Sequence, residues 1–378
     1  MINRIKIVSI VGARPQFIKA SAVSRAMRKK EDMTEVLVHT GQHYDDNMSE
    51  VFFKELEIKE PDYNLGIGGG SHGQNTGRMI ERVEAVLIDE EPDWVLIYGD
   101  TDSTLAGALA AAKLCIPIAH VEAGLRSFNR RMPEEINRIL SDQLSTILFC
   151  PTEKAIQNLK KEGFPHKLAG DTRQQMINVG DVMYDAAIFY SKKAEENSNI
   201  MQRLKFKPKD FVLATIHREE NTDDPDKLRN IIDALNEISE EIPVVFPLHP
   251  RTRIKLGIEK NNQGVKSIKN SNSLCIIEPV SYLDMFMLEK NAKMIITDSG
   301  GVQKEAYFHG IPCLTVRDET EWVELVKIGA NRLSGTNKEA IIKAFKEMKN
   351  KTIEKKRLYG YGDAAEKIVS VLYKFSKD

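Results

Sequence analysis

The sequence predicts an α/β protein built from two Rossmann-like, doubly wound domains that face each other across a cleft. The chain has 378 residues, 42% of them apolar, which is enough for two separate hydrophobic cores. Short Val, Ile and Leu runs alternate with segments of helical periodicity, a pattern typical of repeated βαβ units. The alternation pauses near the middle of the chain and then begins again. We therefore expect ligands in the cleft, because domain interfaces are preferred ligand sites.

The first domain is expected at residues 1–175 and the second at residues 176–378. The polar segment Glu162–Gln202 is poor in strand patterns and is the expected linker. Whether the last helix packs back on the first domain is left open.

Apolar runs predict the strands of both domains, and apolar residues at helical spacing predict the helices. The first domain has expected strands at Ile5–Val11, Val36–Thr40, Trp94–Tyr98, Ile116–Val121 and Ile147–Pro151, with helices at Ser21–Lys30, Gly77–Asp89, Thr104–Lys113 and Pro133–Leu144. The second has expected strands at Phe211–Ile216, Ile242–Leu248, Leu274–Ile277, Met294–Thr297 and Pro312–Val316, with helices at Asp224–Ile238, Tyr282–Asn291 and Val302–His309.

The charge balance argues against a nucleic-acid or membrane partner. Lys and Arg number 54 against 55 for Asp and Glu, a formal charge of −1, so any anion binding must be local. The N-terminus does not have the pattern of a signal peptide, and the sequence has no window near the roughly 18 apolar residues of a membrane span. The four cysteines lack metal-ligand spacing and lie in or beside apolar runs. We expect buried, reduced thiols in a cytoplasmic protein.

Three carboxylates stand where a parallel sheet binds ligands. Asp100 and Glu122 follow apolar strands, and Glu134 opens a helix. Residues just beyond the carboxyl ends of such strands lie on the ligand-binding edge, so convergent acids suggest proton chemistry. Asp100 could instead cap the next helix, and Glu134 could complement the helix dipole. Glu122 needs a partner, either Arg126 or a substrate.

Two strand-to-helix turns suggest anion sites. In the turn Gly12–Lys19, Arg14 and Lys19 add positive charge, although an ordinary tight turn with solvated cations is the better explanation of this segment taken alone. In the turn Thr297–Glu305, the backbone N–H groups of Ser299, Gly300 and Gly301 suit a diphosphate, and Glu305 suits a ribose diol. Asp298 and Ser299 could simply cap that helix, but capping does not require two glycines.

Two histidines follow strands of the second domain. A single histidine at a strand end is more often structural, but His217 and His249 are each followed closely by an arginine at the same edge of the sheet. We therefore expect that His217 or His249, when protonated, neutralises a departing phosphate. The glycine-rich segment Gly66–Gly70 reads equally well as a substrate lid or as a plain connector.

Nine segments in order over nearly the whole chain resemble the non-hydrolysing UDP-N-acetylglucosamine 2-epimerase family. They are Gly12–Lys19, Thr40–His43, Gly99–Thr101, His120–Arg126, Pro133–Arg138, His217–Asn221, His249–Pro250, Thr297–Gln303 and Arg317–Glu321. The resemblance implies a GT-B type fold, a homodimer, and an isomerase without redox cofactor or required metal. It also implies UDP elimination to a 2-acetamidoglucal, then re-addition of UDP with a proton delivered to the opposite face of C2.

The resemblance also assigns roles to residues. It implies Asp100, Glu122, Glu134 and His217 as catalytic residues. The implied substrate-binding residues are Arg14, Lys19, Arg138, His249, Met285, Ser299, Gly300, Gly301 and Glu305.

Three departures from the family pattern bear on substrate and regulation. Glu219 stands where an arginine is usual, and Trp322-Val323 replaces a common Arg-Pro pair. Tyr44-Asp45 follows His43 where allosterically regulated members tend to carry another glutamine. These variants look more like the branch acting on UDP-2,3-diacetamido-2,3-dideoxyglucuronate. UDP-N-acetylglucosamine is the expected substrate as the family default, with that sugar as the alternative.

Other functions make different predictions. A GT-B glycosyltransferase would transfer the sugar to an acceptor, but it offers no role for three acids in the first domain. A UDP-sugar sensor would bind its ligand unchanged, and a hydrolysing epimerase would release UDP and free sugar.

Overall fold

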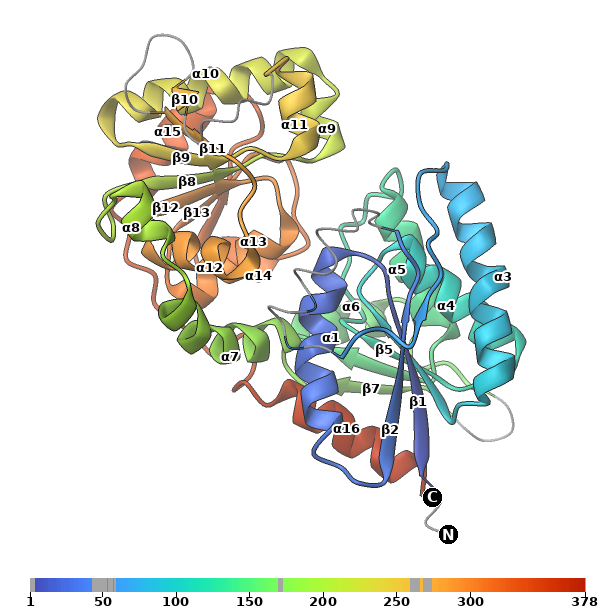
Figure 1. Ribbon diagram of the computed structural model, residues 1–378. Helices are drawn as coiled ribbons and strands as arrows, with labels where there is room; N and C mark the ends of the chain where they lie inside the picture. Colours follow the sequence, from blue (N-terminus) through green and yellow to red (C-terminus); the bar gives the residue numbers. More distant parts are fainter. Residues whose placement is uncertain are drawn as a thin grey trace. The chain divides into compact units, whose positions relative to one another are not determined.

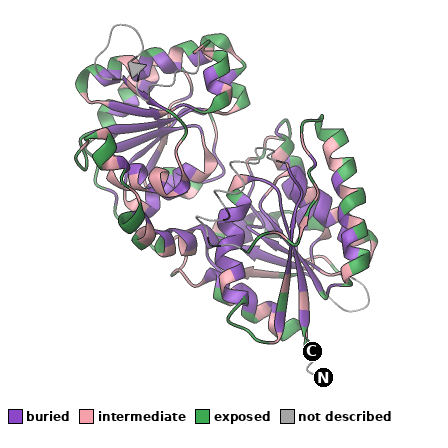
Figure 2. Ribbon diagram, in the orientation of Figure 1, coloured by how far each residue is buried: buried purple, intermediate pink, exposed green. Residues whose placement is uncertain are grey.

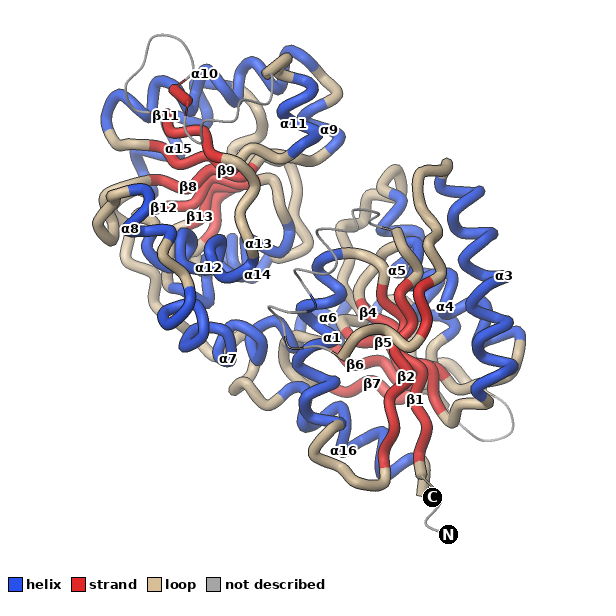
Figure 3. The backbone as a smooth tube through the Cα atoms, viewed as in Figure 1, coloured by secondary structure: helices blue, strands red, loops and turns tan. Residues whose placement is uncertain are grey.

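The computed structural model describes residues 4–42, 53, 57, 59–168, 173–258, 266–267 and 274–377. The chain divides into two compact units, whose elements are labelled in Figure 1. Unit 1 comprises Met1–Ile188 and Arg357–Asp378, and unit 2 comprises Phe189–Lys356. Each unit holds one sheet with helices packed beside it (Figure 3).

The sheet of unit 1 is parallel throughout, in the order β3-β2-β1-β4-β5-β6-β7. The strand order reverses between β1 and β4, and doubly wound sheets bind ligands beyond the carboxyl ends of the strands at such a reversal. The elements are β1 (Ile5–Val11), α1 (Arg14–Met27), β2 (Met33–His39), β3 (Tyr63–Asn64), α3 (His72–Glu90), β4 (Trp94–Tyr98), α4 (Asp102–Lys113), β5 (Ile118–Val121), α5 (Pro133–Leu144), β6 (Ile147–Cys150), α6 (Glu153–Lys161), β7 (Gln175–Asn178), α7 (Val182–Asn197) and α16 (Ala364–Phe375).

The sheet of unit 2 has the order β10-β11-β9-β8-β12-β13-β14, with only β10 antiparallel to its neighbour among the described strands. Its order reverses between β8 and β12. The elements are α8 (Ile200–Leu204), β8 (Val212–Thr215), α9 (Glu219–Thr222), α10 (Pro225–Glu241), β9 (Val244–Pro247), α11 (Pro250–Lys255), β10 (Lys266–Ser267), β11 (Leu274–Ile277), α12 (Tyr282–Asn291), β12 (Met294–Thr297), α13 (Gly300–His309), β13 (Cys313–Thr315), α14 (Val323–Lys327), β14 (Asn331–Leu333) and α15 (Lys338–Met348). The prediction of two doubly wound α/β domains is confirmed.

The central strands are buried on both faces, as their continuous apolar runs predict. In β8, Val212 and Ala214 join a cluster with residues of α10 and α15. Leu213, which points the opposite way, packs with residues of α8, α12 and α13. Figure 2 shows the strands buried, while α3 and α10 expose their outer sides. The carboxyl ends of these rigid strands therefore provide fixed positions for side chains.

The boundary between the units lies after Ile188, within α7, rather than at residue 175. The beginning of α7 is tied to the C-terminal segment, because the Asp181 amide donates to the carbonyl of Tyr359 and the Ala365 amide donates to the Asp185 carboxylate. Helix α16 then packs against α1. The C-terminal helix thus belongs to unit 1.

Several helices and strands lie where the sequence predicts none, among them the edge strands β3, β7, β10 and β14. β7 falls inside the expected linker Glu162–Gln202. Its two end residues are exposed and its two middle residues are half-buried, so this edge strand gave no apolar run. β14 is a three-residue edge strand with one apolar residue. Short edge strands are half solvated and so have weak sequence patterns.

The cysteines are all free thiols, but they are not all buried as expected. Cys150 and Cys313 are buried, whereas Cys115 is exposed. Cys115 follows the end of α4 in a left-handed conformation, φ 56°, which brings it to the surface. In the described part of the chain, no helix is both long and apolar enough to cross a bilayer, and no group of three potential metal ligands occurs.

Candidate active site

The ligand-binding edge of unit 1 is formed where three neighbouring strands end. β1 leads into Gly12, β4 into Gly99 and Asp100, and β5 into Glu122. Gly99 has φ 63°, and a Cβ atom here would lie 2.9 Å from the Lys19 Nζ and 3.3 Å from a Glu122 carboxylate oxygen. Glycine is therefore required at position 99 for both conformation and space.

Glu122 forms a buried ion pair with Lys19. Both side chains are nearly inaccessible, with exposed fractions of 8% for Glu122 and 7% for Lys19. Glu122 also holds a left-handed backbone conformation, φ 75°, which costs roughly 1–3 kcal/mol for a residue other than glycine. Arg126, the partner that the sequence suggested, instead pairs with Asp142 and Glu162. A strained, buried acid at a strand end is typical of a functional site.

Asp100 pairs with Arg138, whose Nη2 lies 2.6 Å from the carboxylate. Arg138 Nη1 lies 2.8 Å from Glu135, a buried acid that also accepts hydrogen bonds from the amides of Ser127 and Phe128. Burial alone would raise the pKa of Glu135, but these amides and the Arg138 charge outweigh it and lower the pKa. Glu135 is therefore a structural anchor. Its half-buried neighbour on α5 is the predicted catalytic acid Glu134, which precedes Arg138 by one helical turn.

Hydrogen bonds that the sequence did not reveal hold this edge in place. His120 Nε2 lies 2.7 Å from the Gly99 carbonyl oxygen, and its Nδ1 lies 2.8 Å from the Asp142 carboxylate. Both ring nitrogens of His120 are thus engaged, one by the backbone and one by a carboxylate. Burial alone would raise the pKa of Asp142, but His120 and Arg126 outweigh it and lower the pKa. The one available signal was a histidine in an otherwise apolar strand.

Gln16 fixes the turn after β1. Its side-chain oxygen accepts from the amides of Gly12 and Ala13, and its nitrogen donates to the Tyr98 carbonyl at 2.8 Å. The predicted anion-binding residue Arg14 begins α1 immediately after this turn and is half-buried. The turn after β1 is thereby tied to the end of β4, across the reversal in strand order.

The edge of unit 2 is organised by Asp298, which is fully buried at the end of β12. Its carboxylate accepts hydrogen bonds from the amides of His217 and Arg218 and from the Asn221 side chain, at 3.0–3.1 Å. Asp298 thus anchors the segment after β8 instead of capping α13. Ser299 is the N-cap residue of α13 but makes no side-chain capping bond within the described structure. The Ser299 amide donates to the Thr297 hydroxyl at 2.9 Å, so the helix start presents the backbone N–H groups of Gly300 and Gly301, as an anion site requires.

The two histidines lie together, with ring centroids 5.3 Å apart. His217 Nδ1 is 3.6 Å from the Asp298 carboxylate. His249 is the N-cap of α11, and its Nδ1 accepts from the Arg251 amide at 3.2 Å. A protonated Nδ1 cannot accept this bond, so only His217 fits the predicted cationic role in this arrangement.

The protein's own packing does not explain why the first residue of α13, Gly300, is a glycine. Its φ lies outside the left-handed region, and a Cβ there would meet its nearest neighbours, Trp322, Arg218 and Glu321, at 3.8–3.9 Å, an ordinary contact. The remaining explanation is close approach by a ligand. Gly301 and the buried Glu305 follow on the same helix. Met285, also predicted to bind substrate, lies in α12 and packs against the hydrophobic core.

Replacing Gly300 by alanine should therefore leave folding intact and weaken ligand binding. We expect the melting temperature to stay within about 2 °C, and the Kd for UDP to rise roughly 10-fold or more as the methyl blocks backbone approach. Calorimetric titration with UDP checks this. Gly77→Ala is the matched control, because Gly77 lies in α3 with open space around its Cβ position. Unchanged UDP affinity in Gly300→Ala would contradict the assignment.

At two of the three departures from the family pattern, the unusual residue makes contacts with neighbouring side chains of unit 2. Glu219 pairs with Arg251 at 2.8 Å on the surface of unit 2. Trp322 is buried, and the Lys304 ammonium lies 4.2 Å from the centre of its ring, a cation–π contact. His43, Tyr44 and Asp45 lie outside the described residues.

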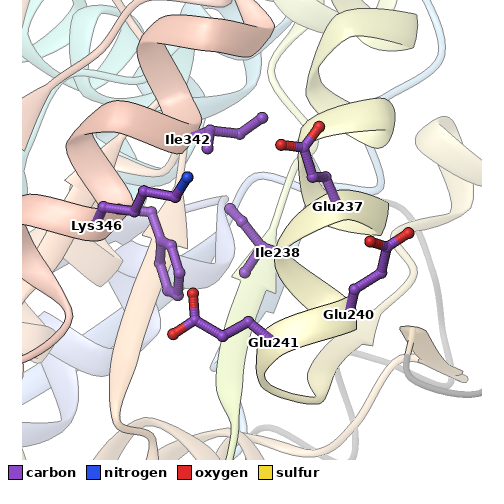
Figure 4. Close-up of a pocket in the computed structure, with 7 residues that line it drawn as sticks. Glu237, Ile238, Glu240, Glu241, Ile342 and Lys346 are labelled. Carbon is purple, nitrogen blue, oxygen red and sulfur yellow. The ribbon is translucent and has the colours of Figure 1, made fainter.

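A shallow pocket of about 240 Å³ lies between α10 and α15 (Figure 4), and seven residues line it: Glu237, Ile238, Glu240, Glu241, Ile342, Phe345 and Lys346. The lining residues of α10 directly precede β9, so the pocket is near the amino ends of the strands. It is thus at the opposite edge of the sheet from His217 and Gly300.

Comparisons with known proteins agree with this arrangement. The family model described as UDP-N-acetylglucosamine 2-epimerase matches residues 25–373. A UDP-2,3-diacetamido-2,3-dideoxy-D-glucuronate 2-epimerase from Pseudomonas aeruginosa is 53% identical, over 98% of this chain and 99% of the relative. A UDP-N-acetylglucosamine 2-epimerase from Methanocaldococcus jannaschii is 46% identical, over 97% of this chain and 98% of the relative.

Solved structures extend the similarity to the whole fold. The M. jannaschii UDP-GlcNAc 2-epimerase in complex with UDP-GlcNAc and UDP has a TM-score of 0.87 at 44% identity, covering 98% of this chain and 99% of that chain. The Neisseria meningitidis enzyme bound to UDP-GlcNAc also has a TM-score of 0.87, at 32% identity, covering 98% of this chain and 100% of that chain. The fold is of the GT-B type, and the chain belongs to the UDP-N-acetylglucosamine 2-epimerase family.

Proposed function

We propose that this protein inverts C2 of a UDP-2-acetamido sugar, with UDP-N-acetylglucosamine converted to UDP-N-acetylmannosamine. The observation that carries the proposal is the strained, buried Glu122 in its ion pair with Lys19, at the ligand-binding edge of unit 1. Glu122 is a carboxylate in this pair, the form that accepts a proton. The family membership supports the same chemistry.

The hydrogen at C2 has no adjacent carbonyl group, so a carboxylate alone cannot remove it. Departure of UDP from C1 must develop positive charge there as the proton leaves. The departing diphosphate carries the electron pair of the C1–O bond, and an anion is stabilised by the N-terminus of α13 and by a protonated His217. Unit 2 supplies these groups through Ser299, Gly300 and Gly301 at the start of α13.

The second half of the reaction reverses the first. UDP adds again to C1 of the 2-acetamidoglucal, and a protonated acid delivers a hydrogen to the other face of C2. Two acid/base groups are therefore needed, and the set comprises Asp100, Glu122 and Glu134. The sequence of steps is redox-neutral overall, so it requires no redox cofactor.

A second substrate is favoured by one observation. The 53% identical relative acts, by its name, on UDP-2,3-diacetamido-2,3-dideoxy-D-glucuronate, and it matches this chain end to end. That sugar has the same 2-acetamido group, so the mechanism at C2 is unchanged.

Incubation with each UDP-sugar, followed by NMR, tests the proposal. We expect a mixture of the two C2 epimers, with UDP and free sugar staying at trace levels. Accumulation of UDP and free sugar would indicate a hydrolysing epimerase, and transfer to an added acceptor would indicate a glycosyltransferase. An unchanged ligand that still binds would indicate a sensor. Comparing kcat/KM for the two sugars identifies the preferred substrate.

A homodimer and a cytoplasmic location complete the proposal. The exposed apolar side chains Ile136 and Leu140, one turn apart on α5, and Ile88 on α3 suit an interface with a second copy. The molar mass in solution, measured by light scattering, should be twice the 42.7 kDa of the chain. Charged nucleotide sugars do not cross membranes unaided, so an enzyme that uses them is expected where they are made.

A further inference from the structure

The His72 side chain contacts a buried acid, Asp102, at the same edge of the unit 1 sheet as Asp100. It is the first residue of α3 and follows the glycine-rich segment Gly66–Gly70. Its Nδ1 lies 2.8 Å from the Asp102 carboxylate. The His72 side chain is 70% exposed, whereas that of Asp102 is only 9% exposed. The pair joins the start of α3 to the start of α4, two residues beyond Asp100.

Asp102 is in turn connected to Asp100 through Asn137 of α5. The Asn137 amide nitrogen donates to the other Asp102 oxygen at 3.1 Å and to the Asp100 backbone carbonyl at 3.0 Å. This amide has two hydrogens, one for each acceptor. The next residue, Arg138, binds the Asp100 carboxylate at 2.6 Å. Residues of α5 therefore hold Asp100 at both its backbone and its side chain.

We propose that His72, Asp102 and Asn137 form a positioning chain that orients Asp100 for proton transfer. The inference rests on the proposed function, in which Asp100 belongs to the acid/base set. Helix capping does not explain the arrangement, because Thr101 is the N-cap of α4 and its hydroxyl accepts from the Thr104 amide. The chain also gives the glycine-rich segment a fixed end on the acid/base edge.

The chemistry of the His72 contact separates positioning from proton transfer. Nδ1–H donates to Asp102 whether the ring is neutral or protonated, so the positioning contact persists as the histidine titrates. An asparagine at position 72 places an amide N–H close to the Nδ1 position but cannot carry a proton. Positioning therefore tolerates His72→Asn, and proton transfer does not.

The test compares turnover of His72→Ala and His72→Asn with the wild type. We expect His72→Ala to lower kcat roughly 10-fold with KM changed less than about 2-fold, because small displacements of an acid/base group cost rate more than binding. His72→Asn should recover most of kcat. Asn75→Ala is the control, since it breaks the contacts of Asn75 with Gly70 in the same segment but leaves the chain to Asp100 intact.

Three results would overturn the proposal: wild-type kcat in His72→Ala, equal losses in His72→Ala and His72→Asn, or an equal loss in Asn75→Ala. A thermal cycle gives an independent readout. The melting-temperature losses of His72→Ala and Asn137→Ala should be less than additive in the double variant if Asp102 links them, and additivity would refute the link. If the wild type epimerises neither sugar, the proposed function fails. The thermal cycle still decides whether His72 and Asn137 are coupled through Asp102.

Discussion

Replacing Glu122 by glutamine should lower turnover by roughly 10²-fold or more while leaving UDP binding nearly unchanged. A neutral amide cannot remove the C2 proton, and loss of a positioned acid or base costs about 10²–10⁴-fold. UDP affinity is retained in this account because the diphosphate-binding groups Ser299 and Gly300 lie in the other unit.

The same substitution should also destabilise unit 1. It removes the charge opposite Lys19, whose side chain is only 7% exposed, and breaking a buried ion pair costs about 3–5 kcal/mol. The glutamine oxygen still accepts from the Lys19 ammonium, so we expect the lower end of this range. Chemical denaturation of wild type and variant gives the difference in unfolding free energy.

Glu90→Gln is the matched control for Glu122→Gln. Glu90 also pairs with a lysine, Lys6, but both are partly exposed and Glu90 ends α3, near the amino ends of the strands. An exposed pair contributes about 0–1 kcal/mol, so this variant should keep its turnover and most of its stability. Wild-type turnover in Glu122→Gln would contradict the acid/base assignment, and an equal loss in Glu90→Gln would show that charge removal alone is responsible.

Asp298→Ala should have the second large effect, because one buried carboxylate supports the whole segment after β8. Its removal leaves the amides of His217 and Arg218 and the Asn221 side chain without their acceptor. Each unsatisfied buried donor costs about 1–3 kcal/mol, so we expect about 3 kcal/mol or more of destabilisation. Turnover should fall by about 10²-fold, since His217 loses its anchor.

Asp318→Ala is a suitable control for Asp298→Ala. Asp318 follows the neighbouring strand β13 at the same edge of the sheet but is exposed. Its loss should change stability by less than about 0.5 kcal/mol. Thermal unfolding of both variants measures the change in stability, and steady-state kinetics measures the change in turnover. If Asp298→Ala keeps wild-type turnover, the segment after β8 does not depend on this anchor.

The fold could be predicted from the sequence because the central strands have recognisable apolar patterns. Buried parallel strands are continuous apolar runs, so Trp94–Tyr98 and Met294–Thr297 were assigned with the bounds that the structure gives them. β7 and β14 were missed because edge strands bury only part of their surface. The predicted linker contains the boundary between the units, after Ile188, but β7 and much of α7 also lie inside it.

The sequence predicted that the candidate residues lie at strand ends, but not which residues they contact. The ends of the predicted strands located Asp100, Glu122 and His217, because the topology of a parallel sheet fixes its carboxyl edge. The side chains that pair with these residues come from distant segments of the chain, and a local sequence pattern does not show which distant segments will meet. Lys19 and Glu122 are 103 residues apart in the sequence, and Asn221 and Asp298 are 77 apart. Capping was one of the alternatives for Asp298, because the sequence shows its helix but not the segment that it anchors.

Deuterium incorporation at C2 in heavy water tests the central claim most directly. Elimination and re-addition remove the original hydrogen and deliver one from an acid that exchanges with solvent. The account predicts that UDP-N-acetylglucosamine, or its diacetamido-glucuronate relative, yields an epimer with one deuterium at C2. An epimer that forms while keeping its original C2 hydrogen, or no exchange with either sugar, would contradict it.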